Sequence, residues 1–203
     1  MKTVDRHLSL DAARRLDWRF LLPSPELGRV GCAGRLDAAL LQALDAAAGP
    51  VRTVDRAGTT SAEATCDVIV LAAPTRAELV GLIPLLRPGG WLYLELQGAF
   101  SVRGRIGGRL RRARAHQATL RLHGFDNVAL HWHWPSFAMS KWIVPLDDPT
   151  VVRRALERHR GGVWIRLLEM LGRLLLRVHL LATFAPAVSI IAHRPAGRSG
   201  GTG

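Results

Sequence analysis

Residues 66–73, CDVIVLAA, and residues 85–96, LLRPGGWLYLEL, are two apolar runs with a helical stretch between them. The first run is typical of a strand that is buried on both faces of a parallel sheet. Thr75 and Glu78 have the spacing of a capping box at the start of the helix, and residues 87–90, RPGG, supply the turn that ends it. This order predicts a βαβ unit with a right-handed crossover, and therefore an α/β sandwich.

The flanking sequence extends this unit in both directions. We predict strands at 29–34, 51–54, 127–134 and 187–193, and a helix over 35–48 that Gly49-Pro50 ends. In domain terms, we expect an N-terminal helical lead at 1–26, an α/β core at 27–135 and 187–195, a helical insertion at 136–186, and a disordered tail at 196–203.

The composition and charge of the chain narrow the possible classes of protein. The chain has 203 residues, of which 48% are hydrophobic and 22% are charged, so we expect a single globular domain. The net charge of +12 comes almost entirely from arginine and indicates G+C-rich coding as much as a nucleic-acid partner. Cys32 and Cys66 lack the spacing of a metal site, so we predict no metal. No leader or long uncharged run is present, which predicts a soluble cytoplasmic protein.

The order of parts resembles the class I S-adenosylmethionine-dependent methyltransferases. Residues 85–95 look like that family's turn into its fifth strand, and residues 66–71 look like its fourth strand. Residues 122–128, LHGFDNV, look like the entry to its sixth strand, and residues 187–195 look like its antiparallel seventh. The resemblance implies a Rossmann-like sandwich with a mostly parallel sheet and a helical insertion before the last strand.

The resemblance also implies a set of cofactor-binding residues. Gly31 and Gly34 match the glycine turn that approaches the methionine part of S-adenosylmethionine, and Asp55 matches the acid that binds the ribose. The alternatives are a βα turn without a ligand and a carboxylate that caps a strand end. Only eleven residues separate Asp55 from Asp67, too few for a further helix and strand. We therefore expect one βα unit to be missing, together with the wall that holds the adenine, and the cofactor to be either absent or S-adenosylmethionine.

The strand at 127–134 carries the candidate catalytic residue. His131 and His133 alternate with Trp132 and Trp134, so the two histidines share one face. His133 is the candidate general base, since imidazole titrates near neutral pH. The alternative is a core pair of tryptophans with hydrogen-bonded histidines. The arginine-rich stretch 103–114 is either a solvated loop or a grip for an acidic group.

Over residues 163–181 we predict an apolar helix with one narrow polar stripe. Its predicted partner-interface residues are Trp164, Leu167, Leu168, Leu171, Leu174, Leu175 and Val178. Because so much apolar surface must be buried, we expect a protein partner, either another subunit or a second copy. A membrane-surface helix and an insertion packed on its own sheet are the alternatives.

These features favour a degenerate methyltransferase-like protein that acts as a non-catalytic accessory subunit. It would stabilise or complete a partner enzyme, and analogy with the family suggests small-molecule (natural product) biosynthesis. The alternative is an active methyltransferase for a small-molecule O or N acceptor, so the enzyme status stays open. An arginine-rich nucleic-acid module ranks third, because stacking aromatics are not interleaved with the arginines.

Overall fold

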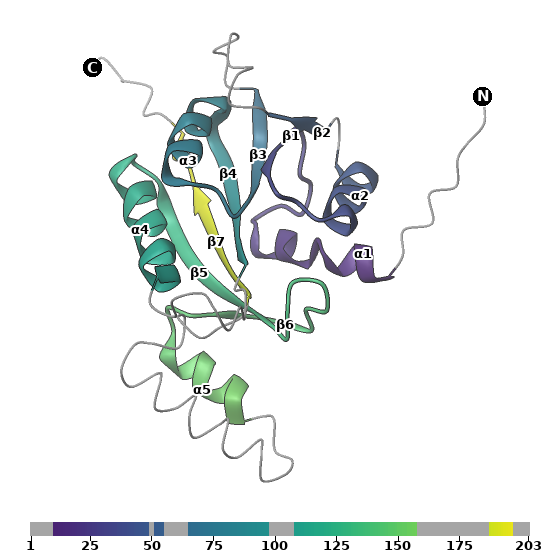
Figure 1. The fold of residues 1–203 in the computed structure, drawn as a ribbon, viewed down its shortest axis with the longest axis vertical. Helices are drawn as coiled ribbons and strands as arrows, with labels where there is room; N and C mark the ends of the chain where they lie inside the picture. Colours follow the sequence, from purple (N-terminus) through teal and green to yellow (C-terminus); the bar gives the residue numbers. More distant parts are fainter. Residues whose placement is uncertain (1–9, 49–50, 55–64, 98–107, 158–186, 197–203) are drawn as a thin grey trace, which may run out of the picture.

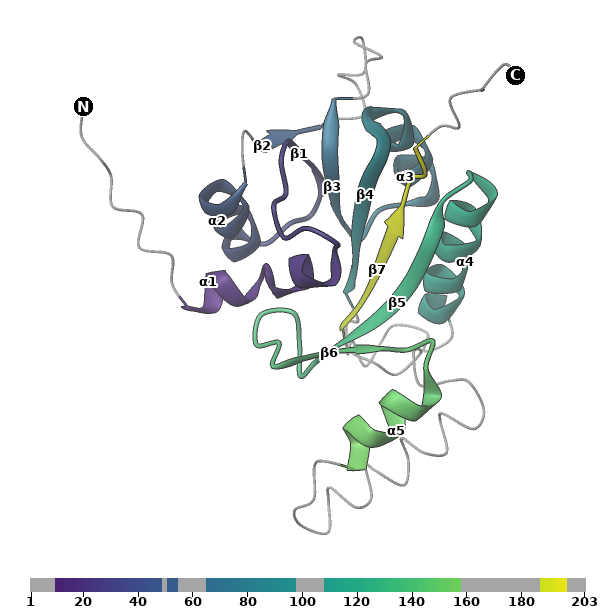
Figure 2. The ribbon, with the colours of Figure 1, turned by 180° about the vertical axis from the view of Figure 1, so that it is seen from behind.

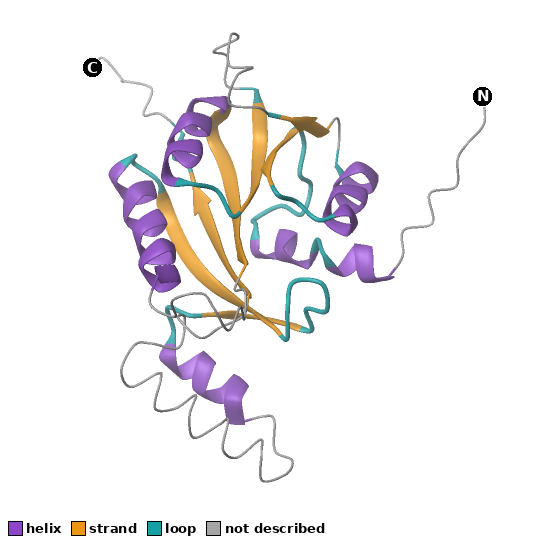
Figure 3. Ribbon diagram, in the orientation of Figure 1, coloured by secondary structure: helices purple, strands orange, loops and turns teal. Residues whose placement is uncertain are grey.

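The computed structural model describes residues 10–48, 51–54, 65–97, 108–157 and 187–196. Its helices are α1 (Leu10–Arg14), η1 (Asp17–Leu21), α2 (Ala38–Ala47), α3 (Arg76–Leu82), η2 (Ile83–Leu85), α4 (Gly108–Leu122) and α5 (Pro149–Glu157). Its strands are β1 (Val30–Gly34), β2 (Val51–Thr53), β3 (Cys66–Ala72), β4 (Leu86–Gln97), β5 (Asp126–Trp134), β6 (Trp142–Pro145) and β7 (Ala187–His193). The strands form one twisted sheet with helices on both faces (Figures 1 and 3).

The strand order is β2-β1-β3-β4-β7-β5-β6. The first four strands pair in parallel, whereas β7 is antiparallel to both β4 and β5. This is a doubly wound order from which the outer third strand is missing. In the described part of the chain, β2 is the outermost strand on its side, and neither a helix nor a strand lies between β2 and β3. The predicted Rossmann-like sandwich lacking one βα unit is confirmed.

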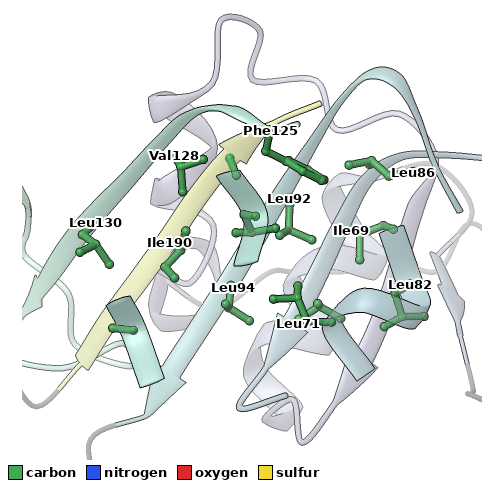
Figure 4. Packing of buried hydrophobic residues seen from close by; sticks show 14 of the residues in the cluster. Ile69, Leu71, Leu82, Leu86, Leu92, Leu94, Phe125, Val128, Leu130 and Ile190 are labelled. Carbon is green, nitrogen blue, oxygen red and sulfur yellow. The ribbon is translucent and has the colours of Figure 1, made fainter. Parts of the chain in front are cut away.

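Strand β3 is buried on both faces, as its continuous apolar run predicts. Ile69 and Leu71 belong to the core beneath α3 and α4, and Val68 and Val70 belong to the core on the opposite face. Figure 4 shows the first of these cores, in which Leu82 of α3 packs near the β3 side chains.

The start of α3 is capped as predicted. The Glu78 backbone N–H donates to Thr75 Oγ1 at 3.2 Å, and the Thr75 N–H donates to Glu78 Oε2 at 2.7 Å. The RPGG turn differs from expectation, because it lies inside β4 and not before it. The pairing of β3 with β4 shifts between Cys66 and Val68, and Gly89 has a φ of 79°. The turn is thus a bulge within the strand.

The described part of the N-terminal segment forms α1 and η1. Figures 1 and 2 both show it beside the carboxyl ends of β1, β3 and β4. Four of its apolar side chains are buried in the core that contains Val68 and Val70 of β3: Ala12, Leu16, Trp18 and Leu22. The segment therefore covers this end of the sheet.

The range assigned to a helical insertion contains a strand as well as a helix. Strand β6 pairs antiparallel with β5 and forms the second edge of the sheet, and α5 follows it. Three apolar residues, Trp142 to Val144, are too short a run to signal a strand by periodicity. The predicted helix 163–181 lies outside the described residues. None of the described helices has the length and apolar character to cross a membrane.

Candidate functional site at the carboxyl edge of the sheet

A row of five residues crosses the sheet near the carboxyl ends of the parallel strands. Strand pairing places Gly34, Ala72, Glu95, Ser189 and His131 next to one another in that order. Directly paired residues point to the same face, so this row faces α1 and η1. The first two members carry little or no side chain, which leaves the Glu95 carboxylate without a bulky neighbour on that side.

Arg15 fills the space beside this carboxylate. Its Nη1 and Nη2 donate to Glu95 Oε1 and Oε2, each at 2.9 Å. On the other side Nη2 donates to Asp37 Oδ2 at 2.6 Å, and Nε to Asp37 Oδ1 at 3.4 Å. The side chains of Arg15 and Glu95 are 2% and 1% exposed, whereas that of Asp37 is 40% exposed. We refer to Arg15, Asp37 and Glu95 as the Arg15 cluster.

Burial and charge act in opposite directions within the cluster. Burial alone lowers the pKa of Arg15, but hydrogen bonds and the charges of Glu95 and Asp37 outweigh it, so the pKa is raised and the guanidinium stays charged. Burial raises the pKa of Glu95, and Arg15 only partly counteracts this. The cluster is therefore a buried ion pair in which each charge depends on the other.

Aromatic side chains enclose the cluster. Trp18 of η1 stacks on Tyr93, with ring centroids 4.0 Å apart and planes 6° from parallel. The Tyr93 hydroxyl donates to Glu95 Oε1 at 3.1 Å, and burial raises the pKa of Tyr93 well above its ordinary value, so the phenol stays neutral. The Phe137 ring lies with its centroid 5.5 Å from Arg15 Cζ. The N-terminal segment and these rings together shield the Glu95 carboxylate from solvent, whereas Asp37 stays partly exposed.

His133 lies in the same layer but is enclosed. Its side chain is 3% exposed, its Nε2 is 2.9 Å from Ser189 Oγ, and its Nδ1 is 3.4 Å from Ser140 Oγ. Burial lowers the pKa of His133 to about 3, with smaller contributions from His131 and Arg15. The imidazole is therefore neutral and engaged at both nitrogens. Its role as a general base stays a prediction.

The two tryptophans of β5 lie on the other face of the strand. Trp132 is buried in the core beneath α4, and the rings of Trp132 and Trp134 meet edge to face with centroids 5.1 Å apart. The two histidines face α1 and η1, so the alternation deduced from the sequence is confirmed.

The predicted glycine turn has a packing explanation. Gly34 has a φ of +89°, and a Cβ at this position would overlap the carbonyl oxygen of Ala72. At Gly31 a Cβ would lie 2.8 Å from Cys66 Sγ. Close approach of β1 to β3 requires glycine at position 34 whether or not a ligand binds, and Gly31 leaves room for the Cys66 side chain. The cofactor role of both glycines stays a prediction. Asp55 and the seven interface residues within 163–181 lie outside the described residues.

The charged residues of the cluster are the part of the site that motif reasoning missed. Arg15 lies in the turn between α1 and η1, between Arg14 and Leu16, and the sequence alone does not distinguish it from the arginines nearby. Asp37 has the pattern of a simple helix cap, a role it does fill by accepting from the Leu40 N–H at 2.7 Å. Glu95 carried a usable signal, because an acid inside the apolar run LYLEL needs a buried cationic partner. In the described part of the chain, no group of three or more His, Cys, Asp or Glu side chains is placed to hold a metal ion.

Comparison with solved structures returns S-adenosylmethionine-dependent methyltransferases. Phosphoethanolamine N-methyltransferase 2 of Haemonchus contortus, solved with S-adenosyl-L-methionine, is 10% identical, with 92% of this chain and 53% of that chain covered and a TM-score of 0.48. A possible histamine N-methyltransferase of Thermotoga maritima is 10% identical, with 91% and 89% covered and a TM-score of 0.45. The order β2-β1-β3-β4-β7-β5-β6 with an antiparallel β7 is a class I methyltransferase-like fold.

The methyltransferase-like fold rests on the strand order and on antiparallel β7. This chain spans about half the length of the Haemonchus contortus enzyme that it matches. At such identities the likeness concerns the fold and not the activity. Neither a protein-family model nor a curated protein matches the sequence.

Proposed function

We propose that this protein is a non-catalytic relative of the methyltransferases that serves as an accessory subunit of a partner enzyme. The observation that carries the proposal is the position of Arg15. In open α/β sheets, ligands bind beyond the carboxyl ends of the strands. Here that region beside β1 and β4 holds the Arg15 guanidinium, which is bound to Asp37 and Glu95, and Trp18 of the same segment stacks on Tyr93.

The Arg15 cluster argues against a cofactor at this edge. S-adenosylmethionine carries a cationic sulfonium, and the two carboxylates at this edge that could face a cation are already bound to the Arg15 guanidinium. Moving Arg15 aside would leave Glu95 buried without its partner, and breaking a buried ion pair in this way typically costs about 3–5 kcal/mol. The residues at this edge therefore do not fit the donor while the N-terminal segment is in place.

The short connection after β2 supports the same conclusion. Twelve residues, 54–65, join Thr53 to Cys66. A full βα unit of about 30 residues, which in the related enzymes supplies an adenine-binding wall, has no room in this interval.

The accessory role draws on the sequence of residues 163–181. The helix predicted there is rich in leucine and carries a narrow polar stripe of Arg166, Glu169, Arg173 and Arg177, a pattern that suits burial against another protein. The partner is either another subunit or a second copy, and small-molecule (natural product) biosynthesis is the setting that the fold suggests by analogy.

Isothermal titration calorimetry of the isolated full chain tests the non-catalytic half of the proposal. We expect no binding heat with S-adenosylmethionine or S-adenosylhomocysteine up to millimolar concentration. Micromolar binding would overturn the proposal and favour the active methyltransferase for a small-molecule O or N acceptor. Purification from the native host tests the other half: a stoichiometric enzyme subunit is the expected companion, and a lone monomer would contradict the accessory role.

A further inference from the structure

The Arg15 cluster has the geometry of a guanidinium-binding site. Asp37 accepts from Nη2 at 2.6 Å and from Nε at 3.4 Å, and Glu95 accepts from Nη1 and Nη2 at 2.9 Å. Two carboxylates thus each face two nitrogens of one planar group. This arrangement matches the fixed fork of a guanidinium, whereas the point charge of an ammonium cannot satisfy both carboxylates in this way.

Neighbouring side chains hold the acceptors in place and cover the bound cation. The Tyr93 hydroxyl donates to Glu95 Oε1 at 3.1 Å and so fixes the carboxylate plane. Phe137 offers its ring 5.5 Å from Arg15 Cζ, within the range of a cation–π contact. The site is thereby lined on its acidic side and on its aromatic side by residues that lie outside the N-terminal segment.

The segment that carries Arg15, residues 10–22, contains polar groups that its docked position leaves without hydrogen bonds. It consists of two single turns, α1 and η1, of five residues each. Trp18 Nε1 and Arg19 Nε are buried and find no hydrogen-bond partner among the described residues, which destabilises the docked position. Phe20 on the same segment is 64% exposed. These features favour a segment that can leave the sheet while the site beneath it stays intact.

We propose that Asp37, Glu95 and Phe137 form a binding site for alkylguanidinium groups, that Arg15 is its built-in occupant, and that residues 10–22 are a displaceable plug. The external ligand is an arginine side chain of the partner protein. Only this identification of the ligand rests on the proposed accessory function. The guanidinium site itself stands on the contacts above.

The Arg15→Ala variant opens the site for a direct test. It removes two methylene groups and the guanidinium, so ethylguanidinium has the size and charge of the missing part. We expect ethylguanidinium chloride at low millimolar concentration to raise the Tm of Arg15→Ala saturably, by about 4 °C at ten times its Kd. Wild-type protein, whose site is filled, should show no such rise.

Two controls make the result specific. Ethylurea has a similar shape without charge, and sodium chloride supplies the same ionic strength. A saturable Tm rise with ethylguanidinium that is absent with both controls and lost in Arg15→Ala/Glu95→Gln supports the site. Equal effects of the three solutes, or a rise that survives loss of Glu95, would overturn it.

If Arg15→Ala is unfolded in buffer, the same titration is read as recovery of tryptophan fluorescence and near-UV circular dichroism. Recovery with ethylguanidinium alone supports the site, and failure to recover overturns it. The outcome is independent of the titration of wild-type protein with S-adenosylhomocysteine. Failure of the non-catalytic proposal and failure of the guanidinium site are therefore separately visible.

Discussion

Replacement of Glu95 by glutamine would leave the Arg15 guanidinium buried with one carboxylate in place of two. Arg15 and Glu95 are 2% and 1% exposed and share two hydrogen bonds of 2.9 Å. Loss of one partner from a buried ion pair costs about 3–5 kcal/mol, and retention of Asp37 places this variant near the lower limit. We therefore expect the free energy of unfolding to fall by about 3 kcal/mol and the Tm by about 6–12 °C.

Urea denaturation followed by tryptophan fluorescence measures this change. Asp37→Asn is the matched control: Asp37 is 40% exposed, and asparagine retains the capping of α2, so we expect a loss of only about 1 kcal/mol. Arg15→Met combined with Glu95→Gln removes both charges and should be more stable than Glu95→Gln alone. The reasoning is refuted if Glu95→Gln unfolds within about 1 kcal/mol of wild type and the double variant is no better.

Three further predictions concern other parts of the fold. His133 stays neutral down to about pH 3 in the folded protein and titrates near 6.5 when unfolded. The free energy of unfolding should therefore fall by up to about 1.4 kcal/mol per pH unit as the pH is lowered from 6.5 to 3. His133→Gln should flatten this dependence, and an unchanged pH profile would contradict the assigned burial. Gly34→Ala should lower the free energy of unfolding in urea by about 3 kcal/mol, because a Cβ would overlap Ala72. Gly81→Ala is the control: its Cβ meets open space in α3, so it should raise the free energy of unfolding by about 0.5 kcal/mol. Equal effects of the two variants would rule out the packing explanation. Thr75→Ala should lose about 1 kcal/mol by removing the capping box of α3 while Thr75→Ser loses little, and a neutral Thr75→Ala would show that the box does not stabilise the helix.

Local patterns were sufficient to predict the central sheet. The apolar run at 66–73 and the capping box between Thr75 and Glu78 are short-range signals, and the structure places a buried strand and a capped helix there. The shortage of residues after Asp55 likewise predicted the missing βα unit, because chain length limits what a connection can contain. Strand β6 escaped prediction because its three apolar residues acquire their meaning only by pairing with β5.

The candidate site was harder to predict because its members are far apart in the sequence. Arg15 and Glu95 are 80 residues apart, and no local pattern links an arginine in the turn between α1 and η1 with an acid in a buried strand. The sequence did indicate His133 and its face of the strand. Burial, which sequence alone does not report, decides that this imidazole is neutral and hydrogen-bonded to Ser189.

The most direct test of the account observes the Arg15 guanidinium itself. In a ¹⁵N-labelled full-length chain, the Nε–H resonance, identified by its loss in Arg15→Lys, should be visible at neutral pH, because hydrogen bonding and burial slow its exchange with water. We predict that 1 mM S-adenosylhomocysteine, an excess over any micromolar Kd, leaves this resonance unchanged. A resonance that is lost to exchange in the free protein, or that shifts when the nucleoside is added, would contradict the claim that Arg15 occupies the carboxyl edge of the sheet.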